Sequence, residues 1–210
     1  MKGTWMAAAL FLVASGPAAH AASLDATTKD GRKVVLAEDG TWSFKEADAA
    51  ATELAATLKK PASATKVVKS KKGFFEMWYD PKKWSAAPGA DGAPTEFVLT
   101  RKDGDAYAMA IVERISVPME AFHDIALNNA KGQAPDARIV MEEKRVVNGS
   151  PVLAMQIEGT IQSIPFKYYG YYWSGKSGTV QFLTYTAQNL FDEALPDFSE
   201  LLNGFVVTKD

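Results

Sequence analysis

The sequence lacks cysteine altogether and holds only two histidines, His20 and His123. The absence of cysteine excludes a structural disulfide, a cysteine-based zinc or iron–sulfur site, and the cysteine needed for acyl anchoring. With so few imidazoles, a Ser-His-Asp hydrolase or a multi-histidine zinc site is disfavoured. The D-x-[DN]-x-[DN]-G spacing of a calcium loop is also missing. We therefore predict no catalytic residues, no metal site and no cofactor.

The chain has almost no excess of charge of either sign, with a formal net charge of -2. No overall field attracts nucleic acid, so we expect no nucleic-acid partner. Lysines nevertheless crowd into one region, 59–83, where Lys69, Lys71 and Lys72 form its centre. One interpretation is a solvated linker and strand edge, where lysine is common. The alternative is that the lysines bind an anionic partner, either phospholipid headgroups or an acidic protein.

Long hydrophobic runs are also scarce, and the one at the N-terminus is short. Lys2 precedes an apolar run from Met6 to Ala14, followed by the small-x-small sequence Ala19-His20-Ala21. This pattern is typical of a secretory signal peptide, residues 1–21, cleaved near Ala21. A retained anchor is disfavoured because the run is too short to span a bilayer. The mature protein is therefore predicted to be periplasmic or secreted.

Two segments precede the predicted main domain. In residues 22–46, two β-prone runs flank Asp39-Gly40, a dipeptide that favours a tight hairpin turn. The segment Asp30 to Phe44 resembles the short DGTW-type element of many bacterial exported proteins. Residues 47–64 are rich in alanine and lysine and are predicted to be a helix or a linker ending near Pro61.

The main domain, 65–210, alternates predicted strands with two predicted helices. One helix is expected after Ser116 with Pro118 in its first turn. The other runs from Leu190 to Leu202, kinked or restarted near Pro196, and stops at Asn203-Gly204. The strands are expected at 73–79, 95–102, 107–115, 138–147, 152–161, 166–173, 179–186 and 205–207. The fold class is therefore α+β, a mostly antiparallel β-sheet flanked by helices with an N-terminal β-hairpin.

Several phrases of the main domain carry a family resemblance. They are the segment 77–84, which reads Met-Trp-Tyr-Asp-Pro-Lys-Lys-Trp, the strand 106–113, Val147-Asn148-Gly149, and 178–185. In this order they resemble the PsbP-like α/β/α sandwich family, which includes uncharacterised bacterial exported proteins. The resemblance implies that architecture first and a non-enzymatic binding or assembly function second. It implies no photosystem-binding or metal-binding residue in this chain.

One sequence motif, read literally, indicates nucleotide binding instead. Gly170 to Ser177 satisfies the Walker A pattern of a phosphate-binding loop. Bulky aromatics fill the loop, and a strand is predicted after it instead of the helix that a phosphate site needs. We therefore expect a hairpin turn at 174–177 and no nucleotide.

The aromatic run 166–173, which overlaps this motif in the sequence, is the second candidate binding surface after the lysine cluster. In an extended strand Tyr169, Tyr171 and Trp173 share one face, while Phe166, Tyr168 and Tyr172 share the other. Either the strand is central and covered on both sides, or one face lines an open cleft or a partner surface. The candidate partner-binding residues are therefore Tyr169, Tyr171, Trp173, Lys69, Lys71 and Lys72.

The preferred functional prediction is an exported, non-catalytic periplasmic binding or assembly module that contacts an envelope protein or a membrane surface. The alternative is a small-ligand carrier or enzyme with a cleft at the sheet edge. It needs a pocket where Glu113, Asp80 or His123 converges with tyrosine hydroxyls. A third possibility is a structural envelope protein in which the hairpin and the main domain merely package each other.

Overall fold

A small antiparallel sheet belongs to the first of two units into which the chain divides, residues 1–47 and 48–210. A computed structural model describes residues 24–27, 33–36, 42–44 and 58–208. The small sheet has the order β1 (Leu24–Thr27), β2 (Lys33–Leu36), β3 (Trp42–Phe44). The pairing of β2 with β3 confirms the predicted hairpin, whereas β1 was not expected.

Some predictions fall elsewhere in the chain. Three of them lie outside the described residues: the signal peptide 1–21, the Asp39-Gly40 turn and most of the helix or linker 47–64. Among the helices that the structure describes, none combines the length and the apolar character needed to cross a bilayer.

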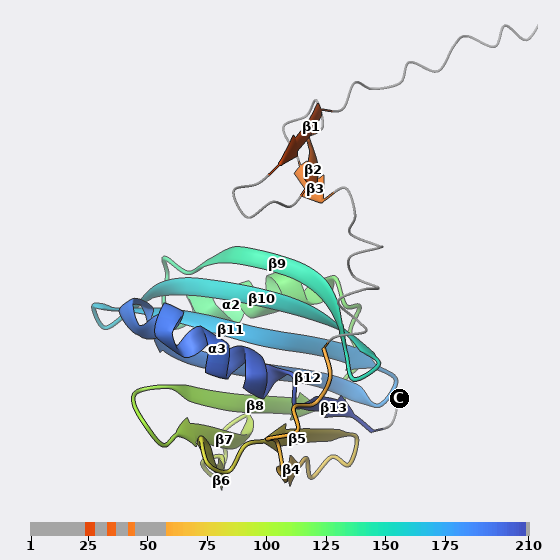
Figure 1. Cartoon of the computed structure of the whole chain (residues 1–210), viewed down its shortest axis with the longest axis vertical. Helices are drawn as coiled ribbons and strands as arrows, with labels where there is room; N and C mark the ends of the chain where they lie inside the picture. The colour runs from red at the N-terminus through yellow and green to blue at the C-terminus, as the bar shows by residue number, and fades with distance from the viewer. Residues whose placement is uncertain (1–23, 28–32, 37–41, 45–57, 209–210) are drawn as a thin grey trace, which may run out of the picture. The chain divides into compact units, whose positions relative to one another are not determined.

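The second unit is built on a seven-stranded sheet in which every pairing is antiparallel. Its order is β6-β7-β8-β12-β11-β10-β9 (Figure 1). The strands are β6 (Trp84–Pro88), β7 (Thr95–Arg101), β8 (Tyr107–Glu113), β9 (Arg138–Val147), β10 (Ser150–Ile161), β11 (Ile164–Gly175) and β12 (Gly178–Ala187). Four of them, β9 to β12, follow one another as hairpins. Asn148 and Gly149 turn the first hairpin with φ of 50° and 85°, as a two-residue hairpin turn requires.

Helices and a second sheet cover the two faces of this sheet. One face packs against α3 (Phe191–Leu202) and a three-stranded sheet of order β13-β5-β4, formed by β13 (Phe205–Val207), β5 (Phe75–Tyr79) and β4 (Lys66–Lys69). The other face packs against α2 (Ala121–Lys131), which lies behind β9 and β10 in Figure 1. A 3-10 turn, η1 (Gln188–Leu190), leads into α3. The predicted α+β class is confirmed.

Each face of the large sheet has its own hydrophobic core, and strand β11 contributes side chains to both. Tyr169, Tyr171 and Trp173 point into the core under α3, and Tyr172 points into the core under α2, where its ring lies 5.6 Å from that of Phe122. All four of these strand residues are buried. Of the two alternatives for this strand, the structure shows the central strand that is covered on both sides.

Three local expectations need correction. The strands β4 and β6 were not predicted, because their exposed lysines, serine and proline mask the alternation. Pro118 precedes α2 instead of lying in its first turn, and its carbonyl accepts a hydrogen bond from the Ala121 N–H. Helix α3 runs through Pro196 as one element and ends before Asn203-Gly204, as predicted.

Asn148 joins distant parts of the unit at one corner. Its Nδ2 donates hydrogen bonds to the carbonyls of Asn203 and Phe205, both at 2.8 Å. Its Oδ1 accepts a hydrogen bond from the Lys60 N–H at 2.7 Å, and its own N–H donates to the Leu58 carbonyl at 3.1 Å. One turn residue therefore holds the first described segment of the unit, the end of α3 and the start of β13.

We expect Asn148→Gly to lower the free energy of unfolding by about 2 kcal/mol, because three side-chain hydrogen bonds are lost while glycine keeps the positive φ of the turn. Urea unfolding followed by tryptophan fluorescence measures this loss. Asn129→Ala, at an exposed position of α2, is the control and should change stability by less than about 0.5 kcal/mol. Equal stability of both variants would contradict the role of Asn148.

Candidate functional site

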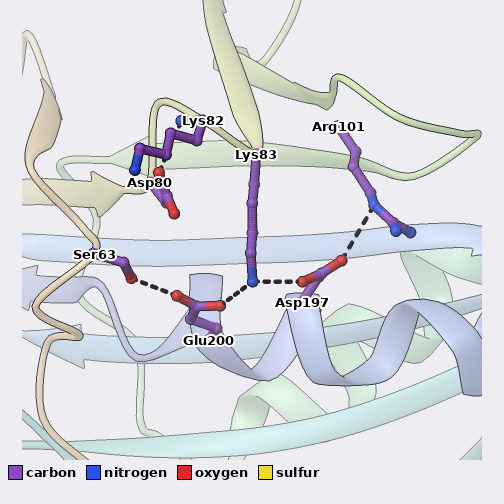
Figure 2. A network of polar contacts seen from close by, with 7 residues as sticks. All are labelled: Ser63, Asp80, Lys82, Lys83, Arg101, Asp197 and Glu200. Atoms are coloured by element: carbon purple, nitrogen blue, oxygen red, sulfur yellow. Dashed lines mark hydrogen bonds and ion pairs between the residues drawn. The ribbon is translucent and has the colours of Figure 1, made fainter.

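A network of polar side chains connects α3 to β7 and to two turns of the chain (Figure 2). The Nζ of Lys83 lies between two carboxylates one helical turn apart, 2.8 Å from Asp197 Oδ1 and in contact with Glu200 Oε2. Arg101 Nε lies 3.2 Å from Asp197 Oδ2, and the Ser63 hydroxyl donates to Glu200 Oε1. We call these five residues the α3 clamp.

The α3 clamp uses all four oxygens of its two carboxylates, and its two cations balance their charge. Hydrogen bonds to Asp197 and then to Glu200 raise the pKa of Lys83 above its ordinary value of 10.5. The cavity beside the clamp has a volume of about 10 Å³, room for a single water. The arrangement therefore holds a helix in place and leaves no carboxylate oxygen of the clamp free to act as a base.

The clamp also explains the motif 77–84. Trp84 is buried against Phe198 of α3, with ring centroids 6.3 Å apart, and Lys83 reaches the same helix. The Asp80 carboxylate accepts a hydrogen bond from the Lys82 N–H at 2.8 Å, which shapes the turn that presents both residues. The phrase that carries the family resemblance is thus a docking device for α3.

The predicted aromatic surface lies in the core. Tyr169 is 2% exposed, Tyr171 0% and Trp173 3%, so these side chains do not form an exposed face of the described unit. Arg145 donates hydrogen bonds to the Tyr169 and Tyr171 hydroxyls, the latter at 3.2 Å, and burial raises the pKa of Tyr169. Placing these three aromatics on a binding surface was wrong, because both faces of β11 are covered.

The predicted lysines lie instead at the surface, beside a groove between two sheet edges. The groove has a volume of about 200 Å³. We call it the lysine groove; it is lined by Val68, Lys69, Lys71, Ala86, Ala87, Pro88, Glu96 and Phe97. Lys72 follows Lys71 and is also exposed. The structure therefore brings Lys69 and Lys71 together at one concave site, with Lys72 adjacent in the chain.

Two glutamates contact residues of this groove, and one of them, Glu96, also lines it. Glu96 accepts hydrogen bonds from the Ser70 hydroxyl, at 2.8 Å, and from the Lys71 N–H, which holds the turn after β4. Glu76 pairs with Lys69 at 2.8 Å. Sequence reasoning missed Glu96, because it lies 25 residues from Lys71 and only the fold places them in contact.

The residues of the enzyme hypothesis do not converge. His123 on α2 pairs with Glu142 of β9, with Nδ1 to Oε2 at 2.6 Å. Asp80 lies on the other side of the sheet, beside the α3 clamp, and Glu113 is exposed at the end of β8. These three groups therefore lie in separate parts of the unit.

A row of tyrosines was also missed. Tyr107, Tyr185 and Tyr168 stand opposite one another on β8, β12 and β11, with ring centroids 5.5 and 5.4 Å apart. They are half-buried, and burial raises the pKa of Tyr168 and of Tyr185. The signal in the sequence is that the strand 107–113 carries large apolar or aromatic residues on the face that includes Tyr107.

The literal Walker A segment forms a hairpin. β11 ends at Gly175 and β12 begins at Gly178, so Lys176 and Ser177 lie in the turn that was predicted there. Gly170 lies within β11, where an added Cβ would lie 2.5 Å from the Leu183 side chain. This glycine therefore serves close strand packing.

Comparisons with solved structures show what this fold resembles. The chain is similar to cyanobacterial PsbP (CyanoP) from Synechocystis sp. PCC 6803, with 14% identity and a TM-score of 0.50, over 70% of this chain and 94% of the other. It is also similar to LpqN, which is involved in cell envelope biogenesis of Mycobacterium tuberculosis, with 9% identity and a TM-score of 0.51, over 69% and 90%. No protein-family model and no curated protein sequence matches the chain. The second unit therefore has a PsbP-like fold.

We expect Lys83→Met to lower the free energy of unfolding by about 1 kcal/mol at pH 7, the usual worth of a partly exposed ion-pair network. Because its folded pKa is raised, Lys83 stabilises the fold at pH values below 10.5 and loses this effect as the pH rises through the folded pKa. The difference between wild type and Lys83→Met should therefore shrink in strong alkali.

Lys82→Met is the matched control for this measurement. Its side chain is exposed and makes no contact drawn in Figure 2, so its unfolding curve should follow that of the wild type. Equal losses at positions 82 and 83 would show that the effect comes from net charge and not from the α3 clamp.

We expect Tyr171→Ala to lower the free energy of unfolding by about 3 to 5 kcal/mol, because it opens a cavity between β11 and β13. Tyr171→Phe removes only the hydroxyl bonded to Arg145 and should cost about 1 kcal/mol. Chemical denaturation measures both. A Tyr171→Ala variant of wild-type stability would contradict the burial of this ring.

Proposed function

We propose that the chain is an exported, non-catalytic binding or assembly module that binds an anionic partner at the lysine groove. The single observation that carries this proposal is the groove itself, a concave site of about 200 Å³ with Lys69 and Lys71 in its walls and Lys72 beside it. Clustered ammonium groups at a concave surface favour an acidic partner and speed its association.

The charge balance around the groove supports an anionic partner. The Glu96 carboxylate is engaged by Ser70 and by the Lys71 backbone, and Glu76 by Lys69 and by the Trp78 indole N–H at 3.2 Å. Within the part of the chain that the structure describes, no acidic side chain pairs with the ammonium groups of Lys71 and Lys72. These charges are available to a ligand.

Export rests on the predicted signal peptide, and the envelope as the place of action rests on that prediction together with an analogy. The fold is shared with LpqN, a protein involved in cell envelope biogenesis. Fold analogy alone does not identify a partner. A periplasmic or secreted location with an envelope protein or membrane surface as partner is therefore part of the proposal.

The competing function, a small-ligand carrier or enzyme, receives less support from the groove. Pockets for small molecules usually enclose roughly 300 to 1,000 Å³, and this groove of about 200 Å³ is smaller and open. Its apolar lining and its lysine rim fit the side chains of a larger partner better than a fully enclosed ligand.

The proposal is tested by crosslinking in intact cells with a triple variant, Lys69→Glu, Lys71→Glu and Lys72→Glu. We expect this variant to lose the crosslinked partner adduct of the wild type, because reversing three charges repels an acidic surface. Mass spectrometry of the adduct band gives its yield and identifies the partner.

The matched control reverses three exposed lysines away from the groove, Lys82, Lys131 and Lys144, and changes the net charge equally. This control should keep the adduct. Both triple variants should unfold at the temperature of the wild type. An adduct that survives in the groove variant, or disappears equally in both variants, would contradict binding at the lysine groove.

A further inference from the structure

We infer that the ligand of the lysine groove is an extended acidic peptide segment of a partner protein, which adds a strand to the free edge of β4. This inference rests on the proposed function and specifies its ligand. Strand addition gives affinity through main-chain hydrogen bonds and specificity through alternate side chains.

The groove lies between two sheet edges. In the described part of the chain, β4 is the outer strand of the three-stranded sheet and pairs with β5 alone. β6 is likewise the outer strand of the seven-stranded sheet and pairs with β7 alone. An outer strand presents unpaired backbone N–H and C=O groups along its free side, which an incoming strand can satisfy.

The walls of the groove offer two kinds of contact. Val68, Ala86 and Phe97 provide apolar surface, whereas Lys69 and Lys71 carry charge. Successive side chains of an extended peptide point to opposite sides. A segment that alternates acidic and apolar residues would therefore place its carboxylates near the lysines and its apolar side chains against the walls.

The turn after β4 is preorganised by hydrogen bonds within the protein. Glu96 binds both the Ser70 hydroxyl and the Lys71 N–H, and Lys72 contributes its carbonyl to a hydrogen bond from Arg114 at 2.7 Å. Holding this turn lowers the entropy lost when a peptide binds, because the edge does not need to be ordered first.

The length of the edge sets the length of the ligand. β4 spans four residues, and a strand rises about 3.3 Å per residue, so the edge extends for about 13 Å. A core of four or five peptide residues matches this edge. A lipid headgroup layer satisfies the same lysines by charge, but it offers no backbone groups to β4.

The test is fluorescence anisotropy with the full chain and a labelled peptide of about ten residues that alternates glutamate and valine. A second peptide has the same sequence with N-methyl groups on the residues facing β4, which removes N–H donors and keeps the charge. We expect the N-methylated peptide to bind at least about tenfold more weakly, since several main-chain hydrogen bonds are lost.

Protein variants separate charge from strand addition. Lys69→Glu with Lys71→Glu should weaken the unmodified peptide by at least about tenfold, whereas Lys131→Glu with Lys144→Glu should leave binding within about twofold. Amide hydrogen exchange gives a structural readout. Binding of the unmodified peptide should protect backbone amides on β4 that exchange freely without it.

These experiments distinguish a failure of the strand-addition inference from a failure of the proposed function. If both peptides bind equally and the lysine variant still abolishes binding, strand addition is wrong and the proposed function stands. If the lysine variant binds the peptide as the wild type does, the proposed function fails together with this inference. If neither peptide binds but vesicles of phosphatidylglycerol capture the wild type and not the lysine variant, the partner is a membrane surface and the inference is overturned.

Discussion

The burial of aromatic rings on both faces of β11 is the constraint on which the rest of the second unit depends. Tyr169, Tyr171 and Trp173 need an apolar cover on one side and Tyr172 needs one on the other. A strand of this kind is unstable at a sheet edge or on a solvated face, so it lies between β10 and β12 with α2 and α3 on opposite sides. The hydroxyls of Tyr169 and Tyr171 require polar partners on the α3 side, and Arg145 of β9 donates a hydrogen bond to each of them.

Two elements cover the aromatic rings on the α3 side of the large sheet: helix α3 and the three-stranded sheet. The lysine groove lies where the three-stranded sheet meets the edge of the large sheet. Helix α3 lies over β11 and β12, and the three-stranded sheet completes the core with Phe75, Met77 and Phe205. Since this second sheet is separate from the large one, two additional strand edges exist. The α3 clamp holds the helix at one side of the junction, while the lysine groove opens between β4 and β6. The same packing requirement thus produces both the rigid support and the exposed edges.

Much of the fold was predictable because the long strands carry a strong local signal. The alternation of apolar residues and the turn dipeptide Asn148-Gly149 located β9 to β12 and their hairpins, and the apolar periodicity located both helices. β4 and β6 were missed because both are short edge strands, whose exposed residues are chosen for solubility and not for packing. The order of strands across the sheets also depends on long-range packing that single-sequence patterns do not encode.

The candidate site was predictable only in part, for a related reason. The density of lysine identified Lys69, Lys71 and Lys72, since exposed charge is visible in composition. The aromatic candidates were misplaced because a Tyr-rich strand has the same sequence whether its faces are open or covered. The partners that organise the site, Glu96 for the groove and the Asp197–Glu200 pair for the clamp, come from distant segments. Contacts of this kind are products of the fold.

The position of Asn148 has a topological consequence. Through this one side chain, the first described segment of the second unit, at Lys60, and its last strand, β13, at Phe205, are held at the same corner. Joining the two segments there would close only a short loop, which costs little chain entropy. Segments near the two ends of a unit that lie this close together are the condition under which circular permutation and domain insertion are usually tolerated.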